Sequence, residues 1–212
     1  MKLFYGNGTC ALGPIILAEW LDLPLEIERV NLKEPSEEFL AANPLGAVPA
    51  LVLDDGTAMT QVDAIMGYFI DLSSGDLNPE SGLDAGHDIM DRFELHRWQA
   101  FLTGDFHPPF GVWFNPARFT ADRSEAALQA VKDAAEKRVR RVTEELEKQI
   151  GDGKHIALGR RTLLDAYAYA MLRWLRFFDK ELSPWPNIAR FVSAMEADDG
   201  VQKALERERS GA

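Results

Sequence analysis

The chain has 212 residues, of which 46% are hydrophobic, so it can bury a substantial core in one large domain or two small ones. Its net charge of −11 repels polyphosphate and anionic lipid surfaces, and we therefore expect no nucleic-acid partner and no membrane partner. The first residues lack the apolar core of a signal peptide, and no apolar run approaches the length of a membrane span, which predicts a cytoplasmic protein.

Strand and helix signals alternate along the first part of the chain. Residues 2–5 are predicted as a strand, 11–21 as a helix, 25–32 as a strand and 36–42 as a short helix. The short helix ends before Pro44, because the residue that precedes a proline is pushed out of the α region. Alternation of this kind is typical of a layered α/β unit.

Two further strands and one helix follow. Residues 48–60 are predicted to form two strands that are joined at Asp55-Gly56, a dipeptide that favours hairpin turns. Residues 63–72 are predicted as a helix. The order of elements is therefore βαβ followed by ββα.

A segment without periodicity separates this part from the rest of the chain. Residues 73–83 are rich in Ser, Gly, Asp and Pro, which is typical of a linker. We therefore predict a first domain of residues 1–75, a linker of residues 76–83 and a second domain of residues 84–212.

The second domain is predicted to be all helical. Apolar residues recur at three- and four-residue spacing within residues 88–102, 126–150 and 163–178. Thr162 and Asp165 form a capping pattern directly before the last of these runs, which indicates the start of a helix.

Three short motifs point to a known family. They are GNGTCALGPI around Cys10, NPLGAVPALVLDDGT at residues 43–57, and GRRTLLDAYAYA at residues 159–170. Together with the order of elements, they resemble the glutathione S-transferase superfamily over essentially the whole chain, and its bacterial beta-type enzymes in particular. The resemblance implies a thioredoxin-like first domain with a mixed four-stranded sheet, an all-α C-terminal helical bundle, and glutathione as co-substrate. It also implies a homodimer, a small-molecule electrophile or disulfide as second substrate, and a role in detoxification.

Cys10 is the only cysteine, so no intramolecular disulfide can form and a reducing compartment would keep it as a thiol. It precedes a predicted helix, whose N-terminus has unpaired N–H groups and a partial positive charge that favour a negatively charged sulfur. Glutathione transfer needs such stabilisation, because an ordinary thiol is only a few per cent ionised at neutral pH. The resemblance implies that Cys10 donates a hydrogen bond to the glutathione thiolate, or ionises and forms a mixed disulfide. The alternative is a small buried side chain without a chemical role.

Other polar side chains of the first domain are candidates as well. Tyr5 and Thr9 are secondary catalytic candidates, because other classes of the superfamily use a Tyr or Ser hydroxyl near these positions. For Tyr5 the alternative is a ring packed at the end of a strand. Among the first 78 residues only three are Lys or Arg, and of these Lys33 is the best-placed cation for the glycine carboxylate of glutathione. The alternative for Lys33 is a solvated surface lysine.

The resemblance also assigns the groups that hold the rest of glutathione. It places the tripeptide backbone against Val48 and implies a cis peptide bond before Pro49. Without the surrounding motif, the alternative is an ordinary trans proline at the start of a strand. Family members typically carry Glu-Ser or Gln-Ser at the γ-glutamyl end, but here Gln61 is followed by Val62. Because valine cannot donate a hydrogen bond, we predict glutathione binding that is roughly ten- to hundredfold weaker unless backbone N–H groups or Thr60 compensate. Asp63 receives the α-amino group, or it complements the helix dipole.

The second domain is expected to supply the other wall of the site. Beta-type enzymes carry a histidine at the position of Thr103, and here the histidine is displaced to His107. Because positions 96, 103 and 107 share a helical face, His96, Thr103 and His107 are all predicted to face Cys10. A charged histidine there would lower the pKa of the thiol, while the alternative for each histidine is a structural role.

Prolines and aromatic residues end this stretch. Pro108-Pro109 must kink or end the helix. Four aromatic side chains would then offer an apolar wall for an electrophile, with core packing as the alternative: Phe106, Phe110, Trp113 and Phe114. We expect no metal site, because four scattered histidines and one cysteine show no ligand spacing.

The leading hypothesis is a glutathione transferase that conjugates or exchanges the glutathione thiol with apolar electrophiles or disulfides, with Cys10 at the sulfur. A second hypothesis is a glutathione-dependent peroxidase or disulfide reductase, in which Cys10 forms a mixed disulfide that a second glutathione resolves. A third is a non-catalytic ligand-binding protein on the same fold, which Val62 and the few basic residues favour. All three remain open because fold does not fix function.

Overall fold

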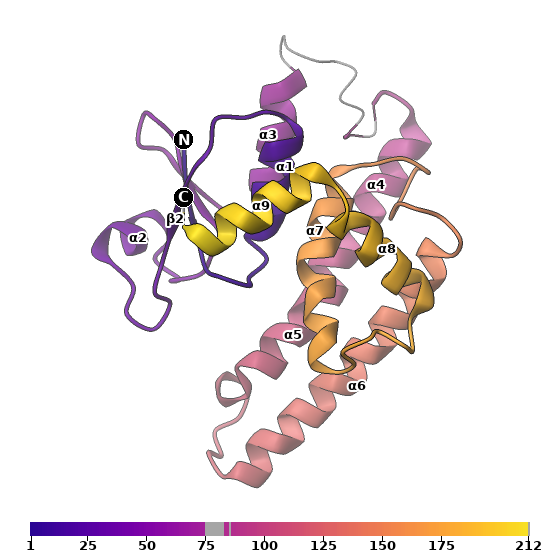
Figure 1. Ribbon diagram of the computed structural model, residues 1–212. Coiled ribbons are helices and arrows are strands. Elements are labelled where there is room, and N and C mark those ends of the chain that lie inside the picture. Colours follow the sequence, from indigo (N-terminus) through magenta and orange to yellow (C-terminus); the bar gives the residue numbers. More distant parts are fainter. Residues whose placement is uncertain (75–82, 85, 212) are drawn as a thin grey trace.

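The computed structural model describes residues 1–74, 83–84 and 86–211, and Figure 1 shows a small sheet beside a larger group of helices. The first unit contains β1 (Lys2–Tyr5), α1 (Leu12–Trp20), β2 (Glu26–Arg29), α2 (Glu37–Ala42), β3 (Ala50–Val52), β4 (Ala58–Thr60) and α3 (Val62–Ser74). The predicted elements are all present, but the second strand is shorter than predicted. It pairs with β1 only as far as Arg29, because β1 itself ends at Tyr5.

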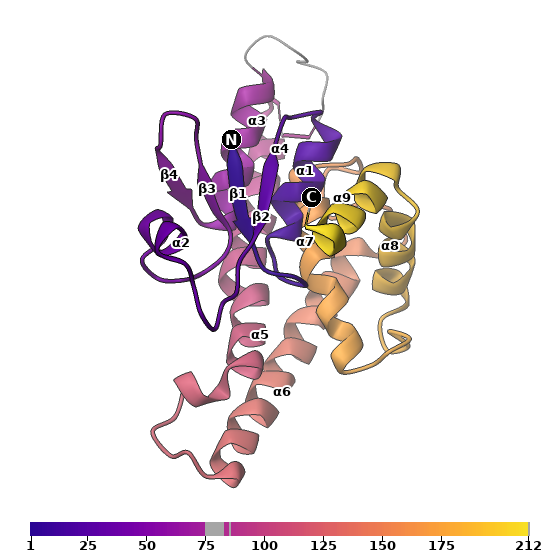
Figure 2. The same cartoon turned by 60° about the vertical axis from the view of Figure 1, so that its left-hand side comes forward.

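The sheet has the strand order β2-β1-β3-β4, as Figure 2 shows. β1 runs parallel to β2 and antiparallel to β3, and β3 runs antiparallel to β4. The parallel pair requires a crossover connection, which α1 provides. This mixed four-stranded sheet is the thioredoxin-like arrangement that the family resemblance implies.

The two faces of the sheet pack against different helices. Successive side chains of a strand point to opposite faces, so Leu3 and Tyr5 of β1 lie in the main core with α1 and α3. Phe4 points to the other face and meets Phe39 of α2, with ring centroids 5.6 Å apart. The central strand β1 is therefore buried on both faces of the sheet.

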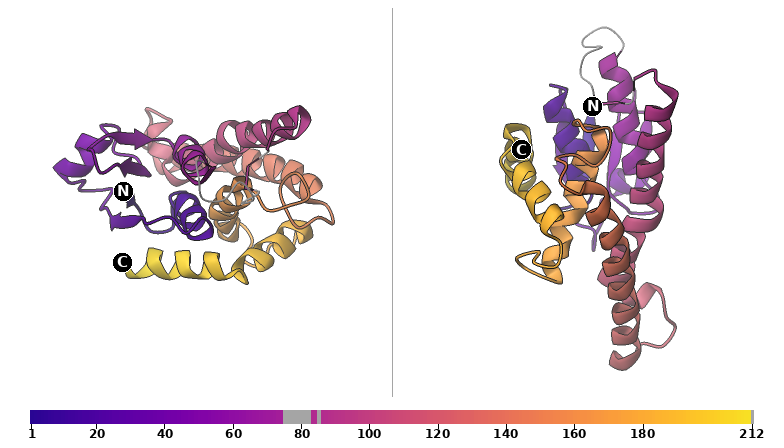
Figure 3. Two further views of the ribbon diagram at one scale, coloured as in Figure 1. Left: turned by 90° about the horizontal axis from the view of Figure 1, so that it is seen from above. Right: turned by 90° about the vertical axis from the view of Figure 1, so that its right-hand side faces the viewer.

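The second unit is helical, as predicted. It contains α4 (Ile89–Phe101), the π-helical turn η1 (Leu102–Phe106), α5 (His107–Phe114), the 3₁₀ turn η2 (Pro116–Arg118), α6 (Glu125–Ile150), α7 (Leu163–Leu172), the 3₁₀ helix η3 (Arg173–Phe177), α8 (Pro186–Glu196) and α9 (Asp199–Ser210). Figure 3 shows α5 and α6 side by side as a pair that projects away from the sheet.

The break predicted at Pro108-Pro109 takes the form of a π-helical turn. The turn η1 separates α4 from α5, and the two prolines then lie in the first turn of α5. Proline is tolerated there because the first N–H groups of a helix have no partner within it. His107, the first residue of α5, is placed by this change of helical register.

A buried capping box starts α7, as the sequence predicts. The Thr162 side chain accepts a hydrogen bond from the N–H of Leu164, and the Asp165 carboxylate accepts one from the N–H of Thr162 at 2.7 Å. The same carboxylate accepts a second hydrogen bond from the N–H of Ile156 at 2.9 Å. Asp165 is fully buried, so these donors replace the water that its charge would otherwise require. By fixing the residue at which α7 begins, the capping box determines which side chains of this helix face the first unit.

The last helix, α9, returns to the first unit and packs along α1 (Figure 3). Its approach is close at Gly200, where a Cβ atom would lie only 2.6 Å from Cδ1 of Trp20. The indole N–H of Trp20 donates to Asp198, the N-cap of α9, at 2.8 Å. The C-terminal end of α9 thereby reaches β1 and β2, next to the turn that holds Cys10.

The predicted linker of residues 76–83 lies outside the described residues except for Leu83. Leu83 is buried, and its carbonyl oxygen accepts a hydrogen bond from the N–H of Leu163 at 3.0 Å. Within the described residues, no helix combines the length and apolar character that crossing a membrane requires.

Candidate active site around Cys10

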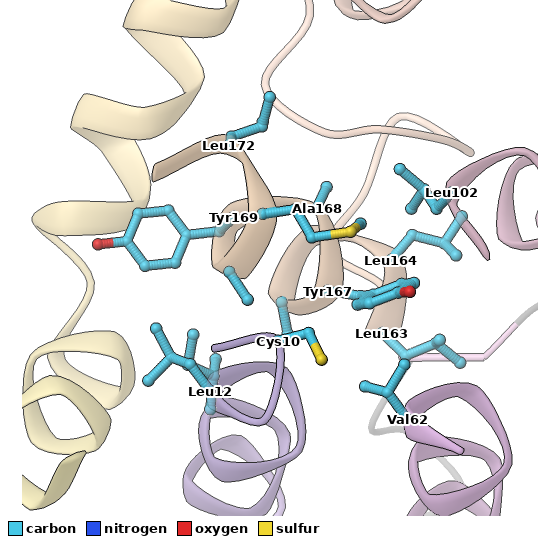
Figure 4. Close-up of a cluster of buried hydrophobic side chains, with 14 of the residues drawn as sticks. Cys10, Leu12, Val62, Leu102, Leu163, Leu164, Tyr167, Ala168, Tyr169 and Leu172 are labelled. Atoms are coloured by element: carbon cyan, nitrogen blue, oxygen red, sulfur yellow. The ribbon is translucent and has the colours of Figure 1, made fainter. Parts of the chain in front are cut away.

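A pocket of about 120 Å³ lies beside Cys10, where the two units meet. The first unit contributes the turn after β1, the loop before β3 and the start of α3, and the second contributes η1, α5 and α7. The pocket is lined by Cys10, Asn43, Ala47, Val48, Pro49, Gln61, Val62, Asp63, Thr103, His107 and Tyr167. In Figure 4 the sulfur of Cys10 points between Val62 and Tyr167. Seven of the predicted site residues thus line one pocket: Cys10, Val48, Pro49, Gln61, Val62, Thr103 and His107.

Cys10 is a protonated thiol in this environment. Its side chain is 7% exposed, and burial raises the pKa of the thiol to about 12. The Sγ–H donates a weak hydrogen bond to the carbonyl oxygen of Val48 at 3.7 Å. The expected lowering of the pKa by a helix N-terminus is not observed, because Cys10 precedes the N-cap Ala11 and burial dominates. The side chain is therefore suited to donate a hydrogen bond to a sulfur anion.

The turn that carries Cys10 is held by side chains from the other end of the chain. The buried carboxylate of Glu208 in α9 accepts a hydrogen bond from the N–H of Gly8 at 3.0 Å. Arg173 of η3 forms an ion pair with Glu208 at 3.0 Å and also donates to the carbonyl oxygen of Thr9 at 3.5 Å. The indole N–H of Trp174 donates to the carbonyl oxygen of Gly8 at 2.8 Å. The position of Cys10 thus depends on α9 and η3.

His107 and Tyr167 form a hydrogen-bonded pair in the pocket. Nδ1 of His107 lies 2.9 Å from the hydroxyl oxygen of Tyr167. Burial lowers the pKa of His107 to about 4 and raises the pKa of Tyr167, so both side chains are neutral near pH 7. When the phenol donates to Nδ1, the imidazole carries its proton on Nε2 as a second donor. Because His107 is neutral, it does not lower the pKa of Cys10 by charge, which corrects that expectation.

Tyr167 is a pocket residue that the sequence pattern does not single out, because the apolar run of α7 is typical of a core helix. The signal that could have located it is the capping box at Thr162, which fixes the register of α7. Gly13 brings α7 close to α1: a Cβ atom at Gly13 would lie 3.3 Å from Cα of Tyr167. The close crossing of these helices places Tyr167 next to Cys10.

The loop before β3 presents backbone groups to the pocket. The peptide bond between Val48 and Pro49 is cis. The side-chain amide of Asn43 holds the loop, since it donates to the carbonyl oxygen of Ala47 at 2.6 Å and accepts from the N–H of Leu45 at 3.1 Å. The backbone of Val48 consequently lies beside the Cys10 sulfur.

The start of α3 forms the opposite end of the pocket. Gln61 has a φ angle of 74°, a strained value for a residue other than glycine, and such strain is concentrated at functional sites. Val62 is buried and offers no polar group. Asp63 is half-buried and accepts a hydrogen bond from the side-chain amide of Gln99 at 2.5 Å, while burial raises the pKa of its carboxyl group.

Two hydroxyl candidates lie outside the pocket lining. Tyr5 is fully buried, and its hydroxyl donates to the carbonyl oxygen of Glu208 at 3.0 Å. Thr9 donates its hydroxyl to the carbonyl oxygen of Gly6 at 2.7 Å and accepts from the N–H of Ala11. Both hydroxyls thus stabilise the region around the turn, which corrects the expectation that they face the sulfur.

Lys33 and His96 are also placed elsewhere. Lys33 is exposed in the turn after β2 and is absent from the pocket lining. His96 is exposed on α4, beside a different hollow that Asp71 and Gln99 help to line. Although His96 shares a helical face with Thr103, seven residues of helix separate them by roughly 10 Å along the axis. The prediction that His96 faces Cys10 is therefore corrected.

The four aromatic side chains of the predicted wall divide into two groups. Phe106 and Phe110 are fully buried in the core, which corrects their assignment to an open wall. Trp113 is half-buried, and Phe114 is 39% exposed and packs edge-on against Trp174, with centroids 5.5 Å apart. Phe114 and Trp113 therefore remain candidates for contact with an apolar ligand.

The comparisons with known proteins agree with this geometry. Models of the glutathione S-transferase N-terminal and C-terminal domains match residues 8–72 and 108–199. The chain is 32% identical to glutathione S-transferase GST-4.5 of Xanthomonas campestris pv. campestris, over 98% of both chains. A sphingomonad glutathione S-transferase solved in complex with glutathione is 31% identical, with a TM-score of 0.82 and 99% of each chain covered. A beta class glutathione S-transferase of Sphingomonas chungbukensis is 30% identical, with a TM-score of 0.82 and 98% of each chain covered.

The chain belongs to the glutathione S-transferase superfamily, and it has the two-part architecture of that family. It is a glutathione S-transferase-like enzyme, and its similar structures include the bacterial beta class member from Sphingomonas chungbukensis. In the part of the chain that the structure describes, no three His, Cys, Asp or Glu side chains converge to hold a metal ion.

Proposed function

We propose that the chain binds glutathione in the pocket beside Cys10 and conjugates it, through its sulfur, to a small apolar electrophile. The observation that carries this proposal is the convergence of Cys10, the Val48 backbone and the His107–Tyr167 pair on one pocket. The sphingomonad relative that was solved with glutathione supports the choice of thiol. In this proposal the tripeptide backbone pairs with Val48, and its sulfur lies against Cys10.

The proposed reaction uses the glutathione thiolate as nucleophile. It attacks the electrophilic carbon, a carbon–sulfur bond forms, and the leaving group departs with its electron pair, while the thiol proton passes to solvent. The Cys10 S–H group donates to the thiolate and stabilises it. In the absence of ligand, the Cys10 S–H group donates only a weak hydrogen bond, because its acceptor, the Val48 carbonyl oxygen, lies 3.7 Å from the sulfur. A sulfur anion in the pocket would be a stronger acceptor for the same S–H group.

The electrophile site is proposed to lie on the aromatic side of the turn. Trp174 contacts Gly8 through its indole N–H, and the exposed rings of Phe114 and Phe177 surround Trp174 and Trp113. Exposed aromatic surface of this kind binds flat apolar molecules through stacking and burial. We therefore propose an aromatic or otherwise apolar electrophile as the second substrate.

The competing functions differ in what they require of Cys10. A glutathione-dependent peroxidase or disulfide reductase needs Cys10 as a thiolate, and the pKa of about 12 that burial gives this thiol disfavours that form. A non-catalytic ligand-binding protein needs no donor at the sulfur. The protonated Cys10 and the neutral His107 are two such donors, which favours the transferase.

Purified protein tests the proposal directly. Calorimetric titration is expected to detect glutathione binding, and activity is expected to be higher with a halogenated nitrobenzene than with hydroxyethyl disulfide. Activity with the disulfide alone would support the reductase instead. Glutathione binding without activity on either substrate would support the binding protein. The absence of glutathione binding and of both activities would contradict the proposal.

We also propose a cytoplasmic homodimer with the division into domains that the sequence predicts. Three apolar side chains at the start of α4 are exposed: Ile89 by 78%, Met90 by 65% and Phe93 by 58%. Adjacent exposed apolar groups mark interaction surfaces, and they support self-association. Sedimentation equilibrium should give twice the chain mass, and a monomer at all concentrations would contradict the dimer.

A further inference from the structure

The indole of Trp174 joins the turn that carries Cys10 to the aromatic side chains of the second unit. Its Nε1–H donates a hydrogen bond to the carbonyl oxygen of Gly8 at 2.8 Å, two residues before Cys10. The same ring system contacts His107, with ring centroids 5.4 Å apart, and Phe114, with centroids 5.5 Å apart. Among the residues that the structure describes, only Trp174 combines a hydrogen bond to this turn with ring contacts to both His107 and Phe114.

Both polar backbone groups of Gly8 are bonded to residues of the second unit. Its carbonyl oxygen accepts from Trp174, and its N–H donates to the buried carboxylate of Glu208. Gly8 has a φ angle of 71°, a left-handed conformation that glycine adopts without strain. The position of the turn is therefore set from the second unit, and Trp174 is the contact through which the aromatic side chains reach it.

The aromatic side chains around Trp174 are open to an apolar ligand, although Trp174 itself is only 6% exposed. Phe114 packs edge-on against Trp174 and is 39% exposed, and Phe177 packs edge-on against Phe114 and is 63% exposed. A flat apolar molecule on these two rings would restrict the indole, because Phe114 packs on it. A thiol beside Cys10 would restrict the turn that accepts the indole hydrogen bond. Each ligand would then order a part of the structure that the other ligand also orders, which lowers the entropic cost of the second binding event.

We propose that Trp174 is a positioning residue that couples the two substrate sites, so that glutathione and the apolar electrophile each strengthen the binding of the other. This inference rests on the proposed function, and it adds a thermodynamic link between the two sites. Such coupling is reciprocal, and it typically changes an affinity by roughly five- to 150-fold. Because one neutral hydrogen bond transmits the effect to the turn, we expect the lower end of this range.

The test measures the dissociation constant of glutathione by calorimetry with and without saturating nitrobenzene, a flat apolar molecule that carries no halide leaving group. We expect nitrobenzene to tighten glutathione binding roughly fivefold in the unmodified protein. Trp174→Phe keeps an aromatic ring but removes the donor to Gly8. This variant should bind each ligand alone, with the mutual enhancement reduced to less than about twofold.

Trp98→Phe is the matched control, because it also removes an indole N–H group, but one that donates to Glu94 within α4. It should keep the full enhancement. The reciprocal titration, of nitrobenzene with and without saturating glutathione, needs no variant and should give the same factor in the unmodified protein. A merely structural role of Trp174 predicts a different result for Trp174→Phe, namely an equal loss of glutathione affinity with and without nitrobenzene.

The outcomes separate this inference from the proposed function. If glutathione and nitrobenzene bind the unmodified protein independently or compete, the coupling is overturned while glutathione binding stands. An enhancement that survives in Trp174→Phe would overturn the role of Trp174 in the same way. If the unmodified protein binds no glutathione, the proposed function fails and this inference fails with it.

Discussion

Replacing Cys10 with alanine is expected to lower kcat/KM for conjugation of an aromatic electrophile roughly ten- to hundredfold, which is the effect of losing a hydrogen bond to a charged group. Replacement with serine should retain much of the activity, because a hydroxyl also donates to a thiolate. The reason is that Cys10 acts here as a protonated donor, with a pKa of about 12. Steady-state rates of the three proteins at fixed glutathione concentration provide the measurement.

The two variants separate the chemical roles of Cys10. If Cys10 forms a mixed disulfide, serine and alanine will be equally inactive, since a hydroxyl cannot replace the sulfur in a disulfide. A pH profile adds an independent check. The activity should show no ionisation of Cys10 between about pH 6 and 9, because its thiol stays protonated below about pH 12. Rapid alkylation of Cys10 by iodoacetamide at pH 7 in the free protein would contradict a buried, protonated thiol.

Removing Arg173 is expected to destabilise the protein more than any surface substitution. Its partner Glu208 has a side chain only 4% exposed, and loss of one partner leaves a buried charge uncompensated, at a cost of about 3–5 kcal/mol. Arg173→Met should therefore reduce the free energy of unfolding by about this amount, measured by denaturant titration. Because the pair also holds Gly8 and Thr9, glutathione turnover should decrease at temperatures where the variant is still folded.

The matched control is Arg176→Met, three residues further along η3. Arg176 pairs with Glu196 at 2.8 Å, but the two side chains are 44% and 34% exposed, so this pair should contribute less than about 1 kcal/mol. The double variant Arg173→Met/Glu208→Met should recover part of the lost stability, because it removes the uncompensated charge. Equal destabilisation by Arg173→Met and Arg176→Met would show that the buried pair has no special role.

Local patterns predict much of this fold because their physical causes are local. The alternation of strand and helix signals in the first 72 residues predicts the order of elements. The position of Val48 and Pro49 at the pocket is implied instead by the family resemblance of the motif at residues 43–57. The capping box at Thr162 and Asp165 predicts the start of α7, since its hydrogen bonds join residues close in sequence. Cys10 is placed correctly for the same reason: it lies in the short turn between a strand and a helix.

The pocket itself depends on contacts between distant parts of the chain, and there local patterns are less informative. Helical periodicity alone places His96 and His107 on one face, but the rise of the helix and the π-helical turn leave only His107 beside Cys10. Tyr5 is a reasonable hydroxyl candidate until α9 supplies the carbonyl oxygen to which it donates. The order of elements and the position of the thiol thus follow from the amino-acid sequence. The protonation state of Cys10 follows from its burial in the folded chain. Its partner groups, and the support of its turn by Glu208, depend on residues up to 200 positions apart that come together only when the chain packs.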